Sequence, residues 1–162
     1  MNKEKMELLY KKIGQQVNLI IPESWDKVLL YSEVTEWSNR TYFYYYPYKK
    51  EEPIYSLDIE DMNNVNEDEV NRQLHQLYEY LRELWMEFKN QKQEQWTNLT
   101  FELISNGKFN IEYSYKNLEN EDSYEQQVIW EYEKLGIIPN DNRQRDFKII
   151  EEYNKSINNN TE

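Results

Sequence analysis

The sequence has no cysteine, three glycines and one histidine, and each scarcity argues against a class of function. Without cysteine there can be no disulfide framework and no thiolate chemistry, which is compatible with a reducing compartment. Gly14, Gly107 and Gly136 stand far apart, so the chain has neither a phosphate-binding glycine loop nor a dinucleotide fingerprint. His75 has no clear Ser partner, and we interpret it as a surface residue. Nucleotide enzymes and thiol catalysis are therefore not expected.

Basic residues and long apolar runs are also scarce. The chain has 19 Lys and Arg against 31 Asp and Glu, a formal net charge of −12, which repels the phosphates of nucleic acids. No apolar run approaches the roughly 18 residues that a membrane-spanning helix needs, and the first residues lack an apolar leader segment. We expect a cytoplasmic protein that binds neither nucleic acid nor membranes directly.

Aromatic residues are plentiful at 15% of the chain, and we expect them to form much of the core. They are densest in the stretch TYFYYYPYKK, residues 41–50. In a strand, alternation places Tyr42, Tyr44 and Tyr46 on one face and Phe43 and Tyr45 on the other. One set should pack under helices, which leaves open whether the other set is covered by the chain or exposed to a partner.

Hydrophobic periodicity predicts helices and strands in alternation. Apolar residues at helical spacing predict a helix over residues 6–20, ending near Pro22, and a stronger one over residues 70–88. Residues 25–36 and 41–48 read as two strands of a hairpin, followed by a weak extended piece at residues 54–59.

A second hairpin is specific enough to predict its register. A three-residue loop, Ser105 to Gly107, with Gly107 left-handed in a bulge, places both apolar sets on one face. The predicted pairs are Leu103 with Phe109, Phe101 with Ile111 and Leu99 with Tyr113. A loop of Asn106 and Gly107 alone would point the two sets to opposite faces.

The last third of the chain predicts two helices. Ser123 and Gln126 have the spacing of a capping box, and the helix should end at Gly136. We expect its inward stripe to be Tyr124, Val128, Tyr132 and Leu135. A last helix, capped by Asn140 or Asp141, should turn inward Phe147, Ile150 and Tyr153.

The predicted order is α-β-β-α-β-β-α-α. It favours an α+β fold in which an antiparallel sheet of about four strands, in two hairpins, is covered by helices. We expect one domain over residues 1–157 and a frayed tail over residues 158–162.

Two acidic clusters are candidates for a binding surface. The first contains Asp58, Glu60, Asp61, Glu67, Asp68 and Glu69, and the second contains Glu119, Glu121, Asp122 and Glu125. Carboxylates favour helix N-termini, which explains part of the clustering without any function. Such patches would also steer a basic protein partner and speed its association.

Catalytic and metal sites find little support. Glu79, Glu83 and Glu87 recur every four residues, but a solvated helix face explains them more simply than a metal site. We expect no cofactor, no metal and no catalysis.

Five segments follow one another along the chain: IIPESWDKVLLYSEV, TYFYYYPY, LHQLYEYLRELWMEF, WTNLTFELISNGKFNIEYSY and WEYEKLGIIPND. Taken in order, from about residue 3 to 155, they resemble the YezG/EsaG family of antitoxins. The resemblance implies an immunity protein that binds and neutralises a nuclease toxin of bacterial type VII secretion (LXG-like) systems until the toxin is exported.

The resemblance and the charge agree on a mechanism, in which an acidic domain occupies the basic cleft of a nuclease. On charge and exposure, the expected partner-binding residues are Asp58, Glu60, Asp61, Glu67, Asp68, Glu119, Glu121, Asp122, Tyr44 and Tyr46. Two alternatives are an acidic adaptor without a toxin partner and a small enzyme that uses paired carboxylates. The sequence does not indicate an oligomeric state.

Overall fold

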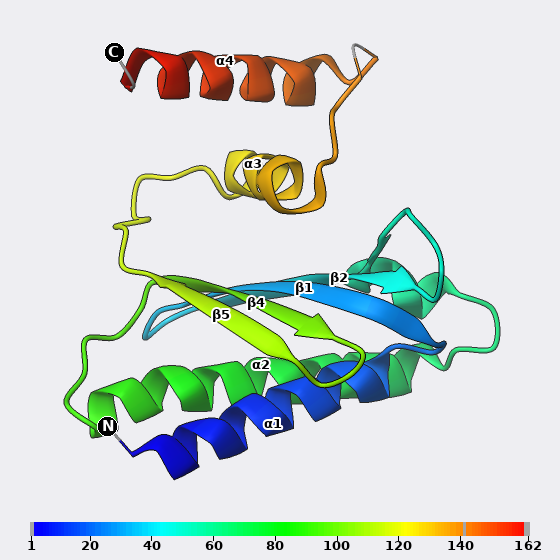
Figure 1. Ribbon diagram of the computed structural model, residues 1–162, viewed down its shortest axis with the longest axis vertical. Helices are drawn as coiled ribbons and strands as arrows, with labels where there is room; N and C mark the ends of the chain where they lie inside the picture. The colour runs from blue at the N-terminus through cyan, green and yellow to red at the C-terminus, as the bar shows by residue number, and fades with distance from the viewer. Residues whose placement is uncertain (1, 141, 161–162) are drawn as a thin grey trace. The chain divides into compact units, whose positions relative to one another are not determined.

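The computed structural model describes residues 2–140 and 142–160, which belong to two compact units, Met1–Lys116 (unit 1) and Asn117–Glu162 (unit 2). Unit 1 holds an antiparallel sheet and two long helices, and unit 2 holds two helices (Figure 1). The single domain expected over residues 1–157 stays a prediction.

The sheet of unit 1 has five strands in the order β3-β2-β1-β4-β5, and every neighbouring pair is antiparallel. The strands are β1 Trp25–Val34, β2 Asn39–Pro47, β3 Ile54–Tyr55, β4 Asn98–Ile104 and β5 Phe109–Ser114. The α+β prediction is confirmed, with five strands in place of about four. The extra strand is short because the 3-10 helix η1, Ser56–Asp61, takes over most of the piece expected to be extended.

The register of the second hairpin is as predicted. Leu103 pairs with Phe109, Phe101 with Ile111 and Leu99 with Tyr113. The Ile104 N–H donates to the Lys108 carbonyl at 2.8 Å, and the Gly107 N–H donates to the Ile104 carbonyl at 2.9 Å. Gly107 has φ 93°, a conformation that favours glycine. The loop is therefore Ser105 to Gly107.

Helices α1, Lys3–Ile20, and α2, Glu67–Asn90, lie on one face of the sheet (Figure 1). Their apolar stripes pack with the inward side chains of the strands to form the core of unit 1. The fully buried residues include Ile13, Leu30, Phe43, Leu77, Leu81, Leu84 and Leu99. Of the two side-chain sets of β2, Phe43 and Tyr45 face these helices and belong to the core, which decides a choice that the sequence left open.

Unit 2 consists of α3, Ser123–Leu135, and α4, Gln144–Asn160. The capping box at Ser123 was wrong by one residue, because the Asp122 carboxylate caps α3 and accepts from the Tyr124 and Glu125 N–H groups. Gly136 ends α3 with φ 67°, as predicted.

Helical spacing predicted only part of the buried face of unit 2. Val128 and Ile150 are buried as expected, whereas Tyr124 and Phe147 are exposed. Spacing identifies the apolar side of a helix but not how much of that side is covered. The helix α4 begins four residues after Asn140, and Asp141, the alternative cap, lies outside the described residues.

The helix α4 continues through Asn160, so residues 158–160 of the expected frayed tail are helical. Residues 161 and 162 lie outside the described part of the chain.

Candidate functional site

The first acidic cluster lies on η1 and the first turn of α2, beside the β3 edge of the sheet. The 3-10 helix η1 is anchored to the core of unit 1, because Ile59 is fully buried and the Ser56 hydroxyl accepts from the Phe43 N–H at 3.1 Å. The structure therefore brings together in unit 1 the predicted residues Asp58, Glu60, Asp61, Glu67 and Asp68. All are exposed except Glu60, which is half-buried.

The start of α2 explains part of this cluster structurally. Asn66 is the N-cap, and its side chain accepts from the Glu69 N–H at 3.0 Å. Glu67, Asp68 and Glu69 occupy the first turn, where the partial positive charge of the helix end stabilises carboxylates. Glu69 also pairs with the Arg72 guanidinium at 2.8 Å. Asp58 likewise lies in the first turn of η1, whereas Glu60 and Asp61 do not lie in a first helical turn.

The second acidic cluster lies in unit 2, at and before the start of α3. Glu119, Glu121 and Asp122 are all exposed. The Glu119 N–H donates to the Asn117 side chain at 2.9 Å, and the Asp122 carboxylate serves as the N-cap. Helix capping therefore explains the Asp122 carboxylate, whereas the Glu119 side chain is exposed to solvent.

The two tyrosines proposed as contacts belong to β2 and differ in exposure. Tyr44 is only 6% exposed, and its ring stacks on Tyr55 with centroids 4.9 Å apart. Tyr46 is half-buried, and burial raises the pKa of its hydroxyl. Tyr45, on the core face, donates to a Glu23 carboxylate oxygen at 2.6 Å. Most of the aromatic stretch is therefore interior, and a partner-binding role of Tyr44 and Tyr46 stays a prediction.

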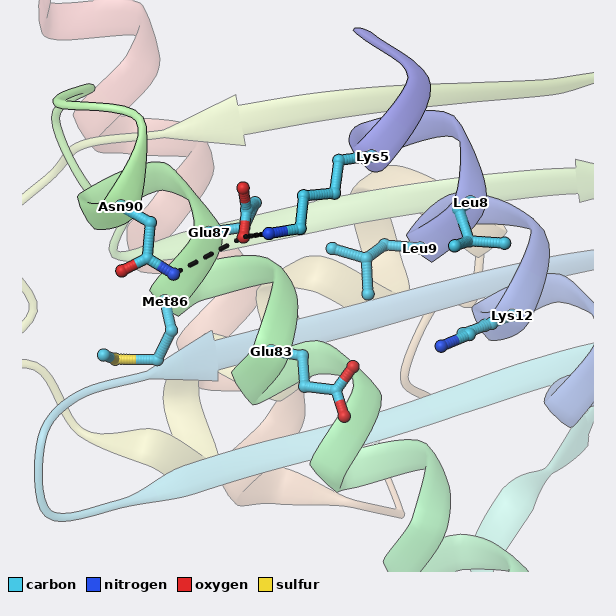
Figure 2. A pocket seen from close by; sticks show the side chains of 8 residues that line it. All are labelled: Lys5, Leu8, Leu9, Lys12, Glu83, Met86, Glu87 and Asn90. Atoms are coloured by element: carbon cyan, nitrogen blue, oxygen red, sulfur yellow. Dashed lines mark hydrogen bonds and ion pairs between the residues drawn. The ribbon is translucent and has the colours of Figure 1, made fainter. Parts of the chain in front are cut away.

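A hollow between α1 and α2 is a feature that the sequence reading missed. Figure 2 shows side chains from both helices around it, and its volume is about 230 Å³. Leu8 and Met86 are 52% and 37% exposed, and Leu9 is buried. The signal was present in the sequence, because Leu8 and Met86 are apolar residues off the main stripes of their helices. The hollow can accept an apolar side chain, and its lining also includes the charged residues Lys5, Lys12, Glu83 and Glu87.

Glu87 borders this hollow and is held by several donors. Its carboxylate accepts from the Gln91 side chain at 2.8 Å. It also accepts from the Asn90 side chain at 3.4 Å and lies 3.4 Å from the Lys5 ammonium (Figure 2). The Gln91 hydrogen bond, followed by those of Asn90 and the charge of Lys5, holds the pKa of Glu87 below its usual value. Glu87 thus links α2 to α1 through its ion pair with Lys5, and it stays ionised at neutral pH.

The other candidate ligands and bases remain on the surface. His75 is exposed and lies 3.7 Å from the Glu79 carboxylate. Within residues 2–140 and 142–160, no group of three or more side chains from His, Cys, Asp or Glu is arranged to hold a metal ion. No helix in the same part of the chain is long and apolar enough to cross a membrane.

Comparison with known proteins decides the family. Residues 6–150 match the family described as "Immunity protein YezG-like". The chain belongs to this family. It is 38% identical to Immunity protein YezG of Bacillus subtilis (strain 168), over 89% of this chain and 97% of that protein. It is 36% identical to Immunity protein YezG of Bacillus spizizenii, over 96% of this chain and 97% of that protein.

A more distant relative extends the comparison. The YezG-like chain is 26% identical to the Type VII secretion system protein EsaG of Staphylococcus aureus, over 95% of this chain and 96% of that protein. The matched range, residues 6–150, includes both acidic clusters and every residue that lines the hollow except Lys5. Membership of the YezG-like family supports an immunity role with a toxin protein as the partner.

Proposed function

We propose that this YezG-like chain is an antitoxin that binds a nuclease toxin directly and neutralises it without catalysis. The observation that carries the proposal is the family match over residues 6–150, combined with a net charge of −12. A nuclease needs a positive cleft to hold DNA, and carboxylates on a compact domain can occupy the positions of the phosphates. The toxin is made inside the cell that it would damage, so the proposed role places this protein in the cytoplasm.

The acidic clusters are proposed to set the rate of association more than the final affinity. Exposed ion pairs contribute only about 0–1 kcal/mol each, whereas a field of like charges accelerates encounter with an oppositely charged cleft. The proposed contact residues are the carboxylates of η1 and α2, those at residues 119–122, and the tyrosines of β2, Tyr44 and Tyr46. The η1 carboxylates are the best supported of these, because they are held on a segment anchored to the core.

The proposal is tested by asking whether a nuclease toxin is encoded beside this gene and, if so, by purifying its nuclease domain. The chain should co-purify with that domain and abolish its cleavage of DNA. If it neither binds nor inhibits the domain, the nuclease assignment is wrong, and a chain that binds no basic protein at all would be an adaptor of another kind.

The two clusters are tested by neutralising three carboxylates at a time. One variant is D58N/E60Q/D61N, the other is E119Q/E121Q/D122N, and the control with the same change in charge is E4Q/E36Q/E94Q. Asparagine at position 122 preserves the helix cap. We expect association to slow about three- to tenfold for a cluster that steers, with a weaker salt dependence, and to change little for the control. An association rate and salt dependence equal to those of the wild-type chain would remove that cluster from the steering surface.

A further inference from the structure

The two edges of the sheet in unit 1 are built differently. At one edge β3 has only two residues and is followed at once by η1. At the other edge β5 has six residues, and among the described residues β4 is its only strand neighbour (Figure 1). Proteins usually protect such an edge with proline, a bulge or inward-pointing charges. Residues 109–114 contain no proline and pair with β4 in a regular register.

The hydrogen bonds of the hairpin determine which backbone groups of β5 face outward. The Ile104 N–H donates to the Lys108 carbonyl, so Lys108 and every second residue after it bond to β4. The N–H and C=O groups of the alternate residues, Phe109, Ile111 and Tyr113, point away from β4. The outer edge of β5 can therefore accept another strand without disturbing the existing sheet.

The side chains of the same three residues form an apolar row along β5, on the face of the sheet that carries the core. Phe109 stacks on Phe101 at 5.6 Å between ring centroids and contacts Tyr10 at the same distance, yet it is 49% exposed. Ile111 and Tyr113 are half-buried and pack against the core. A strand added to β5 would cover the open side of this row.

We propose that β5 pairs with β5 of a second copy, antiparallel and with the two-fold axis at Ile111. In that register Phe109 lies opposite Tyr113 of the second copy, and Ile111 lies opposite itself, so the apolar rows join. On the other face Asn110 lies opposite Glu112 of the second copy, and no like charges meet. The outward backbone groups of both strands are satisfied by each other.

Neighbouring registers are less favourable. An axis at Glu112 would set this carboxylate against its own copy, which is repulsive. An axis at Asn110 would place Tyr113 against Gly107 in the hairpin loop and lose the apolar contact. The axis at Ile111 is the register that pairs the whole length of the strand.

The local charges at this edge do not favour a basic partner. Lys108 and Glu112 balance locally, whereas the acidic cluster on η1 and the start of α2 lies at the opposite edge, beside β3. This cluster would steer a positively charged protein to the β3 edge and not to β5. Pairing through β5 would leave the acidic cluster of each copy available, so this inference goes beyond the antitoxin role and does not depend on it.

The first test measures self-association of the full-length protein by sedimentation equilibrium, with no toxin present. We expect dimers for the wild-type chain. Asn110→Glu, which faces Glu112 of the second copy, should raise the dissociation constant about tenfold, and Asn110→Lys should lower it. The same two changes at the exposed Asn71 of α2 control for net charge and should leave association unchanged. A wild-type chain that stays monomeric at about 100 µM overturns the proposal.

The second test determines the register through cysteines, which the natural chain lacks. Residues directly opposite in a non-hydrogen-bonded pair have Cα atoms about 4.5 Å apart, within disulfide range. The N110C/E112C variant should form a covalent dimer on mild oxidation, and the N110C and E112C single variants should not. Cross-linking of N110C alone would overturn the axis at Ile111. Folding of each variant is checked by circular dichroism.

Discussion

Gly107 and Gly14 show how the same residue type meets opposite demands in two elements. Gly107 has φ 93° in the hairpin loop, with open space around the position of a β-carbon. A side chain there would therefore be disfavoured by the backbone conformation alone. Gly14 lies inside α1, where a β-carbon would meet the Leu103 side chain at 3.6 Å, an ordinary contact. Glycine lowers the stability of a helix at this position, and no turn there requires its conformational freedom.

We expect the two alanine substitutions to change stability in opposite directions. Gly107→Ala should lower the free energy of unfolding by about 1–2 kcal/mol, because it forces a left-handed conformation on an L-residue. Gly14→Ala should raise it by about 0.5–1 kcal/mol through helix propensity. Urea unfolding of both variants provides the measurement. A neutral Gly107→Ala would mean that the loop relaxes into another turn and would contradict the bulged conformation.

Between elements, Glu87 connects α2 to α1, and its lowered pKa makes that connection sensitive to acid. A carboxyl whose pKa is lower in the folded than in the unfolded state stabilises the fold above its ordinary value of 4.5. This contribution is lost as the pH falls below 4.5 through the lowered folded value. The donors that lower the pKa, first Gln91 and then Asn90 and Lys5, are the groups that would lose their charged acceptor.

The consequence is a pH-dependent difference between the wild-type chain and Glu87→Gln. At pH 7 the variant should be less stable, because the ion pair with Lys5 and the charged hydrogen bonds are gone. Below pH 4.5 the difference should shrink as Glu87 becomes protonated in the wild-type chain. Urea unfolding from pH 7 to 3.5 measures it, with the exposed Glu83→Gln as the matched control. A difference that is constant with pH would show that Glu87 acts through packing alone.

Elements with strong local patterns were predictable from sequence, and those decided by neighbouring elements were not. The hairpin of β4 and β5 could be predicted with its register, because alternation and Gly107 admit only one arrangement that joins the apolar faces. The strand β3 was predicted only as part of a weak extended piece over residues 54–59 and was not counted in the sheet, because two residues carry no periodic pattern. The capping box failed because Asp122, one residue earlier, is an equally good cap.

For the molecule as a whole, the sequence predicts the charge but not which side chains are exposed on the surface. The acidic clusters follow from composition, and the structure adds that the η1 carboxylates are held on an anchored segment. The aromatic stretch was ambiguous because both of its faces are apolar, and only the structure shows that Tyr44 is buried. The hollow between α1 and α2 needed the spatial pairing of Leu8 with Met86, two residues far apart in the chain.

At the same scale, we propose that the chain unfolds in one cooperative transition, as a single domain over residues 1–157. Helices of 13 and 17 residues, the lengths of α3 and α4, gain most of their stability from packing and not from the isolated helix, so unit 2 should not outlast unit 1. Leu81→Ala in α2 should lower the free energy of unfolding by about 2–5 kcal/mol, and Val128→Ala in α3 by about 1–3 kcal/mol.

Hydrogen exchange in increasing urea, followed by mass spectrometry, distinguishes the two outcomes. If the chain unfolds in one cooperative transition, the amides of β4 and α3 should become exposed at the same urea concentration within each variant. That concentration should be lower than in the wild-type chain. If Val128→Ala exposed α3 early and left β4 protected as in the wild-type chain, the two units would be separate domains. The core of unit 1 would then fold without contributions from residues 117–162, and the single-domain proposal would be wrong.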